Sequence, residues 1–415
     1  MGSLVEWRKA VLAQVAAERC LTTRTLSPMP HRSLGHITTQ FRTRRGRLRR
    51  DVSASRLRAE RLSEEVSVKT NRPVGIWGHG AYVPRFRIRT SDITEVWRPK
   101  GSASPPVMQK SVLGHDEDTI TMAIEAARTA MGRSEISMSK VGGLWLGTES
   151  KPYEVKPSAT LVAAALGAKG EILAADVEFA CKAGSIAMQA AVAGVGSGMM
   201  EAALAIGVDA AQSRPGDVLE YTAGCGASAM VIGPAEGAIA VIDESLSYGT
   251  NTPDFFRREG AAYPQHGGRF TEEPGYFHHT LAASRLMLER LGASPADFTH
   301  AIFHQPIPKL VERVAKTLGF SRAQIAQGMC VHQIGNAYAG SSMLGLAAVL
   351  DVARPGERIF YCSYGSGAGS DAFAFTVTSQ IEQRRDAATV ERYLNRAEFL
   401  GGYGQYLRLT GSIRM

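Results

Sequence analysis

One unit occurs twice in this sequence and constrains its fold more than any other feature. A helix of almost only small residues precedes a glycine turn and an apolar strand. The first copy pairs the helix predicted at 181–200 (CKAGSIAMQAAVAGVGSGMM) with the strand at 203–209, and the second pairs 341–353 with 359–367. Helices without bulky side chains fit between two sheets, where side-chain volume is limited. The repeat therefore predicts two related halves.

The rest of the chain also alternates strands with helices. VGIWGHGAYVP reads as a strand that Pro84 ends, and 141–150 (VGGLWLGTES) as a buried strand. Residues 118–133 have helical spacing, with Asp118 as the cap and Gly132 as the stop. This alternation predicts an α/β protein with a mostly parallel sheet covered by helices. Together with the repeat, it predicts a five-layered α-β-α-β-α sandwich.

The positive charge of the chain belongs to its front end. The formal net charge is +8 over 415 residues, but residues 1–70 carry 15 basic and 6 acidic residues, and the remainder carries 32 and 33. The body is therefore neutral, which argues against a nucleic-acid-binding protein. The front segment is a disordered extension, an organellar presequence or, with least support, a binding arm. It lacks the apolar stretch of a secretory signal.

Membrane, disulfide, metal and nucleotide-cofactor functions find no support in the sequence. No stretch of 18 apolar residues is free of charges, so no membrane span is expected. H-E-x-x-H, P-loop and Rossmann motifs are absent, so no metal or nucleotide cofactor is expected. The cysteines are odd in number, dispersed and without a C-x-x-C pair, which favours a reducing compartment such as the cytoplasm. They are Cys20, Cys181, Cys225, Cys330 and Cys362.

Cys181 is the first candidate for chemistry, because it begins the first small-residue helix within VEFACKAGS. A thiol at a helix N-terminus lies near the positive end of the helix dipole and near free backbone N–H groups. Both favour the thiolate, and the same N–H groups can hold an oxyanion. The alternative is a buried structural cysteine, which is the commoner role of a lone cysteine.

Four further candidates follow predicted strands. Glu149 and His304 end apolar runs, at the edge where open α/β sheets bind ligands. Burial would raise the pKa of Glu149 and suit it to proton transfer, and a neutral His304 could donate a hydrogen bond to a carbonyl. A solvated glutamate and a partly buried histidine are the alternatives. Asn336 and Ser366 lie in glycine-rich loops whose backbones can approach a ligand.

Taken in order, these stretches resemble 3-hydroxy-3-methylglutaryl-CoA synthase, particularly the archaeal and bacterial type. The resemblance runs from about Val74 to Phe375. It implies a thiolase-like fold and an acyltransferase of the mevalonate pathway, which leads to isoprenoids. The stretches that carry it are GAYVPRFRI, KSVLGHDEDT, GTESKPYEVKPSAT, EFACKAGS, RPGDVLEYTAG, NTPDFFRREG, YPQHGGRFT, FHQPIPK, IGNAYAG and YGSGAGSDAF.

The resemblance also implies a role for each candidate. Cys181 would be the nucleophile that takes an acetyl group from acetyl-CoA, and Glu149 the acid/base that removes a methyl proton from it. His304 would orient and polarise the ketone of acetoacetyl-CoA. Asn336 and Ser366 would line the acyl pocket, with the Ser366 amide joining the Cys181 amide in an oxyanion hole.

Four more residues gain roles only from the resemblance. Thr222 and Thr271 fall at positions that contact the substrate, and Lys309 and Arg313 fall where the family binds the phosphates of CoA. CoA thioesters are then substrates, and no cofactor or metal is needed. A homodimer is expected, as is assembly with an acetoacetyl-CoA thiolase and a small bridging protein. No nucleic-acid or membrane partner is expected, and organellar targeting by the basic segment stays open.

We expect four segments along the chain. Residues 1–70 form the basic extension, 71–245 the half with the nucleophile, 246–385 the half with the histidine and asparagine loops, and 386–415 a tail that packs on the core. Two other functions remain open. One is a condensing enzyme of secondary metabolism that uses a carrier-protein-bound or polyketide acceptor, and the other is a scaffold subunit of a thiolase complex.

Overall fold

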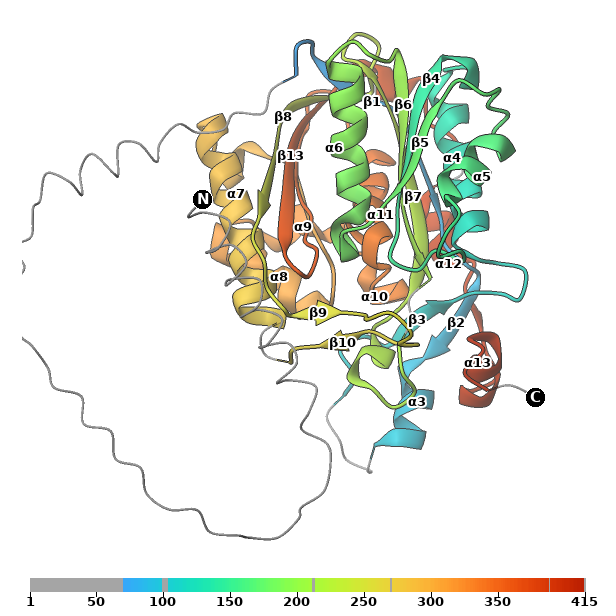
Figure 1. Ribbon diagram of the computed structural model, residues 1–415. Coiled ribbons are helices and arrows are strands. Elements are labelled where there is room, and N and C mark those ends of the chain that lie inside the picture. Colours follow the sequence, from blue (N-terminus) through green and yellow to red (C-terminus); the bar gives the residue numbers. More distant parts are fainter. Residues whose placement is uncertain (1–69, 99–103, 211–212, 269–270, 388, 414–415) are drawn as a thin grey trace, which may run out of the picture. The chain divides into compact units, whose positions relative to one another are not determined.

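The computed structural model describes residues 70–98, 104–210, 213–268, 271–387 and 389–413 (Figure 1). The expected basic extension, apart from its last residue, lies outside these ranges.

A mixed β-sheet runs through the described part of the chain, in the order β11-β12-β13-β8-β1-β7-β6-β4-β5. β1 joins β8 over only two residue pairs, whereas β8 pairs with β13 along most of its length. The sheet therefore divides at β1 and β8 into two parts. The N-terminal part consists of β1 (Val74–Tyr82), β4 (Val141–Gly147), β5 (Leu173–Val177), β6 (Ala202–Ala210) and β7 (Cys225–Pro234). The C-terminal part consists of β8 (Ala240–Gly249), β11 (His300–Phe303), β12 (Arg358–Cys362) and β13 (Gly369–Val377).

The prediction of a mostly parallel sheet is wrong. β4 is parallel to β5 and β6, and β11 is parallel to β12, while the remaining pairs in this sheet are antiparallel. One reason lies in a connection, because a short loop joins β12 to β13 and returns the chain in the opposite direction.

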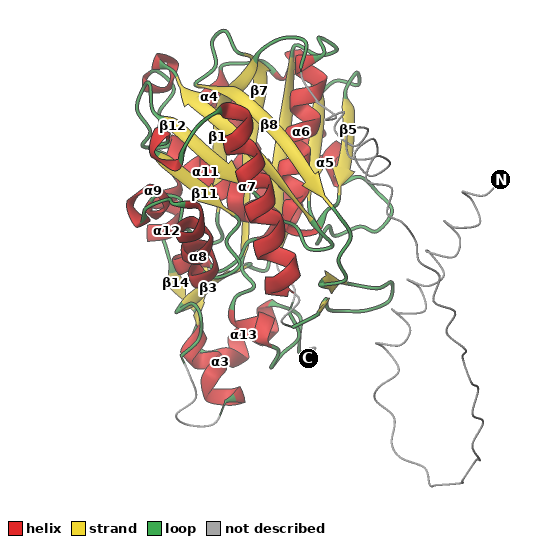
Figure 2. Ribbon diagram, turned by 90° about the vertical axis from the view of Figure 1, so that its left-hand side faces the viewer, coloured by secondary structure: helices red, strands yellow, loops and turns green. Residues whose placement is uncertain are grey.

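Two helices lie between the two parts of the sheet, and other helices cover their outer faces (Figures 1 and 2). The inner helices are α6 (Ala183–Gly196) and α11 (Ser341–Leu350), and every residue of α11 is buried. Gln189 on α6 hydrogen-bonds the backbone of β8, which ties the inner layer to the C-terminal part. The outer helices are α4 (Thr119–Ser134) and α5 (Ser158–Ala165) on one side, and α7 (Phe277–Leu291) and α8 (Pro308–Leu318) on the other. The five-layered sandwich is confirmed.

Local boundaries depart from the sequence predictions at helix ends. Asp118 caps α4 through a capping box, as predicted, but Gly132 lies inside the helix, which ends with Glu135 in the left-handed conformation at φ 59°. The helix predicted over 181–200 is shorter at both ends. A 3-10 turn over Ala180–Lys182 precedes α6, which stops at Gly196.

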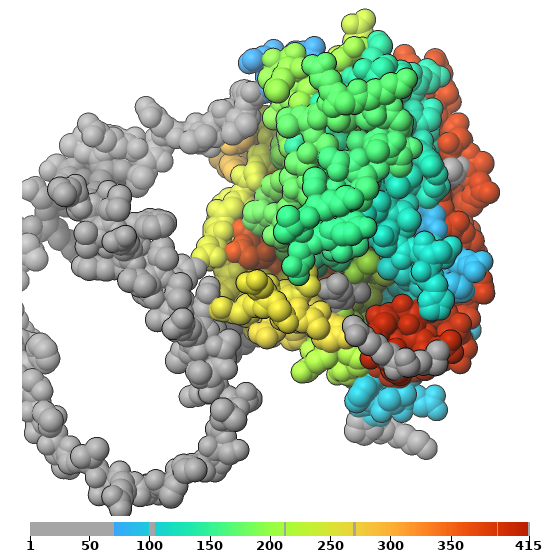
Figure 3. All heavy atoms as spheres, turned by 45° about the vertical axis from the view of Figure 1, so that its right-hand side comes forward, coloured from blue at the N-terminus to red at the C-terminus, as the bar shows by residue number. Residues whose placement is uncertain are grey.

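The C-terminal segment packs beside a small three-stranded sheet. β14 (Glu398–Phe399) pairs with β2 (Phe86–Arg89), and Tyr403 on α13 (Tyr403–Leu409) accepts a hydrogen bond from Trp97 Nε1 at 2.6 Å. Figure 3 shows this segment in red against the cyan residues that precede α4. The other short elements are α3 (Thr90–Trp97), β3 (Gln109–Val112), β9 (Phe255–Phe256), β10 (Gln265–His266), α9 (Arg322–Ala326), α10 (Val331–Ile334) and α12 (Val390–Asn395). The expected boundary at 245 and 246 falls inside β8, and the division into four segments stays a prediction.

Three glycines, Gly147, Gly184 and Gly207, let four segments meet backbone to backbone, and we call them the glycine junction. A Cβ on Gly184 or on Gly207 would lie 2.4 Å from the carbonyl oxygen of Ala339, in the turn before α11. A Cβ on Gly147 would lie 2.2 Å from the carbonyl of Ala183. Contacts this short are excluded for a carbon atom, so β4, β6, α6 and the turn before α11 can approach only because these side chains are absent.

The glycine junction yields a stability prediction with a matched control inside another helix. Gly184→Ala inserts a methyl group against fixed backbone and should lower the free energy of unfolding by about 1–3 kcal/mol. Gly132→Ala in α4, where a Cβ meets nothing within 4 Å, should raise it by roughly 0.4–1 kcal/mol. Urea unfolding followed by circular dichroism measures both. Equal effects of the two substitutions would contradict the close approach.

Candidate active site

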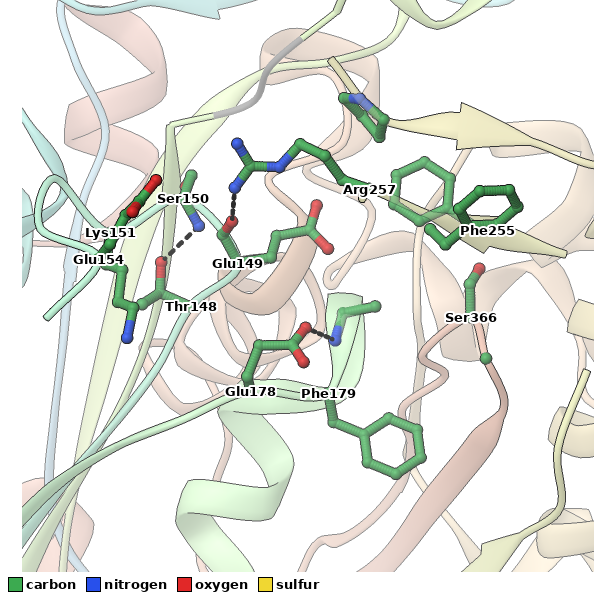
Figure 4. Close-up of a pocket in the computed structure, with 14 residues that line it drawn as sticks. Thr148, Glu149, Ser150, Lys151, Glu154, Glu178, Phe179, Phe255, Arg257 and Ser366 are labelled. Atoms are coloured by element: carbon green, nitrogen blue, oxygen red, sulfur yellow. Dashed lines mark hydrogen bonds between the residues drawn. The ribbon is translucent and has the colours of Figure 1, made fainter. Parts of the chain in front are cut away.

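A pocket of about 500 Å³ opens at the carboxyl ends of β4 and β5 (Figure 4). These strands are parallel, so the loops that follow them meet at one edge, as the position of Glu149 predicted. The Glu149 side chain points into the pocket, with Arg257 on one side and Ser366 on the facing wall. The lining residues are Thr148, Glu149, Ser150, Lys151, Glu154, Glu178, Phe179, Ala180, Phe255, Phe256, Arg257, Pro264, Ser366 and Gly367.

Cys181 lies directly behind this wall. It follows Ala180, which lines the pocket, and its side chain packs with Tyr338 and with Phe255, another wall residue. Cys181 is 7% exposed. Ala180 has φ 44°, a left-handed conformation that costs a non-glycine residue energy and is found preferentially at functional sites. The turn therefore presents Cys181 at the start of α6 in a conformation that the surrounding packing enforces.

The expectation that Cys181 favours the thiolate is wrong. Burial raises the pKa of the thiol well above its usual value, and the carboxylates of Glu149, Asp209 and Asp254 raise it further. A hydrogen bond with the Asn336 side chain opposes this rise but is the weaker influence. The thiol is therefore the resting form of Cys181, and its proton has to leave during reaction.

Glu149 behaves as predicted. Burial raises its pKa well above the ordinary carboxyl value, and the neighbouring carboxylates of Asp209 and Glu178 add to the rise. The guanidinium of Arg257 opposes it, and Arg257 also donates a hydrogen bond to the Glu149 carbonyl oxygen at 3.4 Å. A carboxyl group with a raised pKa is a stronger base when ionised than an ordinary carboxylate, which suits an acid/base.

Asp209 holds the Glu149 loop in place, and the sequence prediction missed it. Its Oδ1 accepts hydrogen bonds from the Glu149 N–H at 2.9 Å and from the Ser150 hydroxyl at 2.6 Å. Its Oδ2 accepts from the Ala339 N–H at 2.8 Å, and burial raises its pKa to about 6. The signal was available, because Asp209 lies near the carboxyl end of β6, which is parallel to β4.

His304 follows β11, as predicted, and is 1% exposed. Burial lowers its pKa to about 3, so the imidazole is neutral. Its ring lies beside the rings of Tyr276 and Tyr364, with centroids 6.4 and 6.3 Å away. Within the described residues its Nδ1 has no hydrogen-bond partner. A neutral histidine can donate a hydrogen bond without carrying a charge into a buried site.

Asp254 fixes the loop that carries Ser366 and was also missed, although it lies in the matching stretch NTPDFFRREG. Its carboxylate accepts hydrogen bonds from the Tyr364 hydroxyl at 2.6 Å and from the Gly367 N–H at 2.8 Å, on the two sides of Ser366. Its carbonyl oxygen accepts from the Thr271 hydroxyl at 3.2 Å. The structure thus places Thr271 beside the support of the Ser366 loop.

Asn336 is held by the backbone of Thr222. The Asn336 N–H donates to the Thr222 carbonyl at 2.7 Å, and the Asn336 Oδ1 accepts from the Tyr338 N–H at 2.9 Å. This arrangement leaves the side-chain amide directed to Cys181. The Thr222 hydroxyl donates to Leu219, at 3.3 Å. The substrate contact expected of Thr222 stays a prediction, and its observed contribution is to position Asn336.

Lys309 and Arg313 are not brought to the pocket wall. Both lie exposed on α8, one helical turn apart. The Arg313 guanidinium lies 4.1 Å from the ring centroid of Phe277 on α7. Their contact with CoA phosphates stays a prediction.

Comparison with known proteins agrees with this geometry. Residues 288–377 match the family described as 3-Oxoacyl-[acyl-carrier-protein (ACP)] synthase III C terminal. The hydroxymethylglutaryl-CoA synthase of Pyrococcus furiosus is 51% identical over 335 residues, which cover 80% of this chain and 95% of that protein. The chain belongs to the hydroxymethylglutaryl-CoA synthase family. It is therefore an acyl-transferring condensing enzyme.

Two solved structures place this family member within the thiolase-like fold. MvaS in complex with 3-hydroxy-3-methylglutaryl coenzyme A superposes with a TM-score of 0.73 at 24% identity and covers 83% of this chain and 92% of its own. FabH, the 3-oxoacyl-(acyl carrier protein) synthase III of Pseudomonas aeruginosa, gives a TM-score of 0.67 at 20% identity and covers 74% and 99%. The thiolase-like fold predicted from the resemblance is confirmed.

The described residues contain neither a candidate membrane span nor a candidate metal cluster. No helix in these ranges is both long and apolar enough to cross a bilayer. No group of three or more His, Cys, Asp or Glu in the same ranges is arranged to hold a metal ion.

The electrostatics of Cys181 can be tested without any substrate. Removing the Glu149 carboxylate in Glu149→Gln removes a repulsion on the thiolate, so the pKa of Cys181 should fall and its alkylation should begin at lower pH. Iodoacetamide labelling over a pH series, with the Cys181 peptide quantified by mass spectrometry, measures this. Glu154→Gln, in the same pocket wall, is the control and should leave the profile unchanged. A shift to higher pH in Glu149→Gln would contradict the assignment.

Proposed function

We propose that this enzyme condenses acetyl-CoA with acetoacetyl-CoA to 3-hydroxy-3-methylglutaryl-CoA through an acetyl thioester on Cys181, as a step of the mevalonate pathway. The observation that carries the proposal is the position of Cys181, buried behind a pocket whose wall holds the proton-exchanging Glu149. The names of the relatives support it. They do not favour the carrier-protein acceptor or the scaffold-only function.

Acetyl transfer is the first step. The Cys181 sulfur attacks the thioester carbonyl of acetyl-CoA, the S–CoA bond breaks, and the thiol proton ends on CoA. The backbone N–H groups of Ser366 and Cys181 hold the oxyanion of the tetrahedral intermediate. Because the thiolate of free Cys181 is disfavoured, the proton leaves as the carbon–sulfur bond forms, and negative charge does not accumulate on sulfur beforehand.

Condensation and hydrolysis follow. The Glu149 carboxylate removes a proton from the methyl group of acetyl-Cys181, and the resulting enolate carbon attacks the ketone of acetoacetyl-CoA. The neutral His304 imidazole hydrogen-bonds that ketone, and the new alkoxide takes a proton. Water then cleaves the thioester, which releases the product with a free carboxylate and restores the Cys181 thiol.

The remaining site residues bind substrate in this proposal. Asn336 orients the acetyl group on Cys181, and Thr222 and Thr271 contact the acyl chains from the two loops they stabilise. Lys309 and Arg313 bind the phosphates of CoA, for which two exposed cations one helical turn apart on α8 are suited. No resident cofactor or metal takes part, because proton transfer and thioester chemistry complete the reaction.

We infer a homodimer in the cytoplasm, with an acetoacetyl-CoA thiolase and a small bridging protein as further partners. The four cysteines in the described ranges are present as thiols, as a reducing compartment requires. β5 is an edge strand of the sheet, and its first residue Leu173 is 49% exposed. An uncovered edge strand offers unpaired backbone groups to a second strand, so we place the dimer interface at β5.

Separate half-reactions test the assignment of Cys181 and Glu149. Wild-type enzyme treated with acetyl-CoA alone should gain one acetyl group on Cys181, seen by mass spectrometry, and Cys181→Ala should gain none and show no turnover. Glu149→Gln should still acetylate but lose about 10²–10⁴-fold in condensation with acetoacetyl-CoA, since only the second step needs the base. Glu154→Gln should retain both. Equal turnover by Cys181→Ala and wild type would refute the mechanism.

The oligomeric state is tested by light scattering after size exclusion. Wild type should elute with twice the chain mass. Leu173→Asp places a charge on the edge strand and should shift the protein to the monomer, with little loss of fold because the side chain is half exposed. Val352→Asp, a similarly exposed apolar residue beyond α11, should stay dimeric. A monomeric wild type would exclude the dimer.

A further inference from the structure

Lys182, the residue after the nucleophile, is a buried lysine that the mechanism above does not use. Its side chain is 2% exposed, and its ammonium nitrogen lies 3.1 Å from Oδ1 of Asp371 on β13, which is completely buried. Within the described residues no donor is aligned with that oxygen as a hydrogen bond, so charge holds the pair together. The Lys182 ammonium also donates to the Ser247 hydroxyl on β8 at 3.0 Å and lies over the Phe179 ring.

The ion pair belongs to a polar network that crosses from the inner helix layer to the C-terminal part of the sheet. The Ser185 hydroxyl, in the first turn of α6, donates to the Asp371 Oδ2 at 2.6 Å and lies 2.6 Å from the Ser363 hydroxyl. The Asp371 N–H donates to the Ser363 hydroxyl at 3.1 Å. Ser363 follows β12 and begins the loop that leads to Ser366. The network therefore fastens that loop to the start of α6.

The loop itself rests on Lys182. Gly365 and Gly369 exchange backbone hydrogen bonds of 2.8 and 2.9 Å, which closes a short hairpin around Ser366. A Cβ on Gly365 would lie 2.5 Å from the Lys182 Cβ and 2.4 Å from the Phe179 carbonyl oxygen. The hairpin and the Phe179–Lys182 turn are therefore in contact with no side chain between them. A displacement of Lys182 moves Ser366 relative to Cys181.

We propose that the Lys182–Asp371 ion pair is a positioning device for acyl transfer, which sets the distance between the Ser366 amide and the Cys181 turn. This inference rests on the proposed function of these two amides as the oxyanion hole. A buried ion pair can often be replaced by neutral groups without loss of stability, so stability alone does not explain this one. Because it lies beneath the hairpin, the ion pair can hold the Ser366 amide in position. This matters because oxyanion donors act only when fixed at the correct distance.

The test separates positioning from stability with the double variant Lys182→Met/Asp371→Asn, which removes both charges and keeps both shapes. The matched control is Asp351→Asn, which breaks a buried ion pair with Arg133 at the far end of α11. Three quantities are measured on the full chain: the thermal midpoint, the single-turnover rate of Cys181 acetylation by acetyl-CoA, and the rate of Cys181 alkylation by iodoacetamide. Alkylation needs the nucleophile but no oxyanion hole.

In the double variant we expect acetylation to slow by about 10²-fold at saturating acetyl-CoA, as for a lost oxyanion donor. The apparent affinity for acetyl-CoA and the alkylation rate should stay within about threefold of wild type, because neither depends on the oxyanion hole. A threefold change is no larger than the effect of losing one hydrogen bond. Asp351→Asn should lower the thermal midpoint without slowing acetylation. A folded double variant that acetylates at the wild-type rate would overturn the proposal, as would a parallel loss of acetylation and alkylation.

Ser363→Ala provides a second test of the proposal if the double variant does not fold. It removes one hydroxyl from the network and no charge, and it should slow acetylation severalfold in the same direction while alkylation is unchanged. An unchanged acetylation rate in Ser363→Ala would then count against the proposal. Failure of the proposed function itself looks different, because wild-type enzyme would then carry no acetyl group on Cys181.

Discussion

The carbonyl oxygen of Ala339 is the point on which this site depends, because two backbone segments close around it. Gly184 of α6 and Gly207 of β6 both approach it to a distance that no side chain allows, and Gly147 brings β4 against α6 in the same way. Each of these segments carries a functional residue two or three positions away. The functional side chains therefore lie close together because their backbone segments do. Their spacing is set by packing that leaves no room for an added methyl group.

This closeness has an electrostatic consequence. The carboxylates of Glu149, Asp209 and Asp254 all raise the pKa of the Cys181 thiol, so the site holds its nucleophile as a neutral thiol. The same crowding raises the pKa of Glu149. The rise of the Glu149 pKa comes from burial, Asp209 and Glu178, and the neutral thiol adds no charge to it.

The layers and the candidate site residues could be predicted from the sequence, but the contacts between them could not. The small-residue helices predicted the inner layer because their composition is a local property. The prediction of a mostly parallel sheet failed because strand direction depends on which loops form hairpins, and the short β12–β13 connection was read as a ligand loop alone. Asp209 and Asp254 were missed for a similar reason. The position of Asp209 at the end of a buried strand was a signal, but the neighbouring residues do not show that a carboxylate accepts hydrogen bonds from distant backbone N–H groups.

Two features support the site, namely the glycine junction and the contacts that hold the Ser366 loop. They lie in different parts of the sheet. The glycine junction fixes Cys181, Glu149 and Asn336, which act on the acetyl group in the proposed mechanism. His304 and Ser366 belong to the C-terminal part, and there Asp254 and the Lys182–Asp371 pair hold the Ser366 loop. In the proposed mechanism Ser366 takes part in acetyl transfer and His304 in condensation, so the C-terminal part contributes to both steps. Lys182 follows Cys181 directly and contacts the Ser366 loop, and it thereby links the two parts of the sheet at the site.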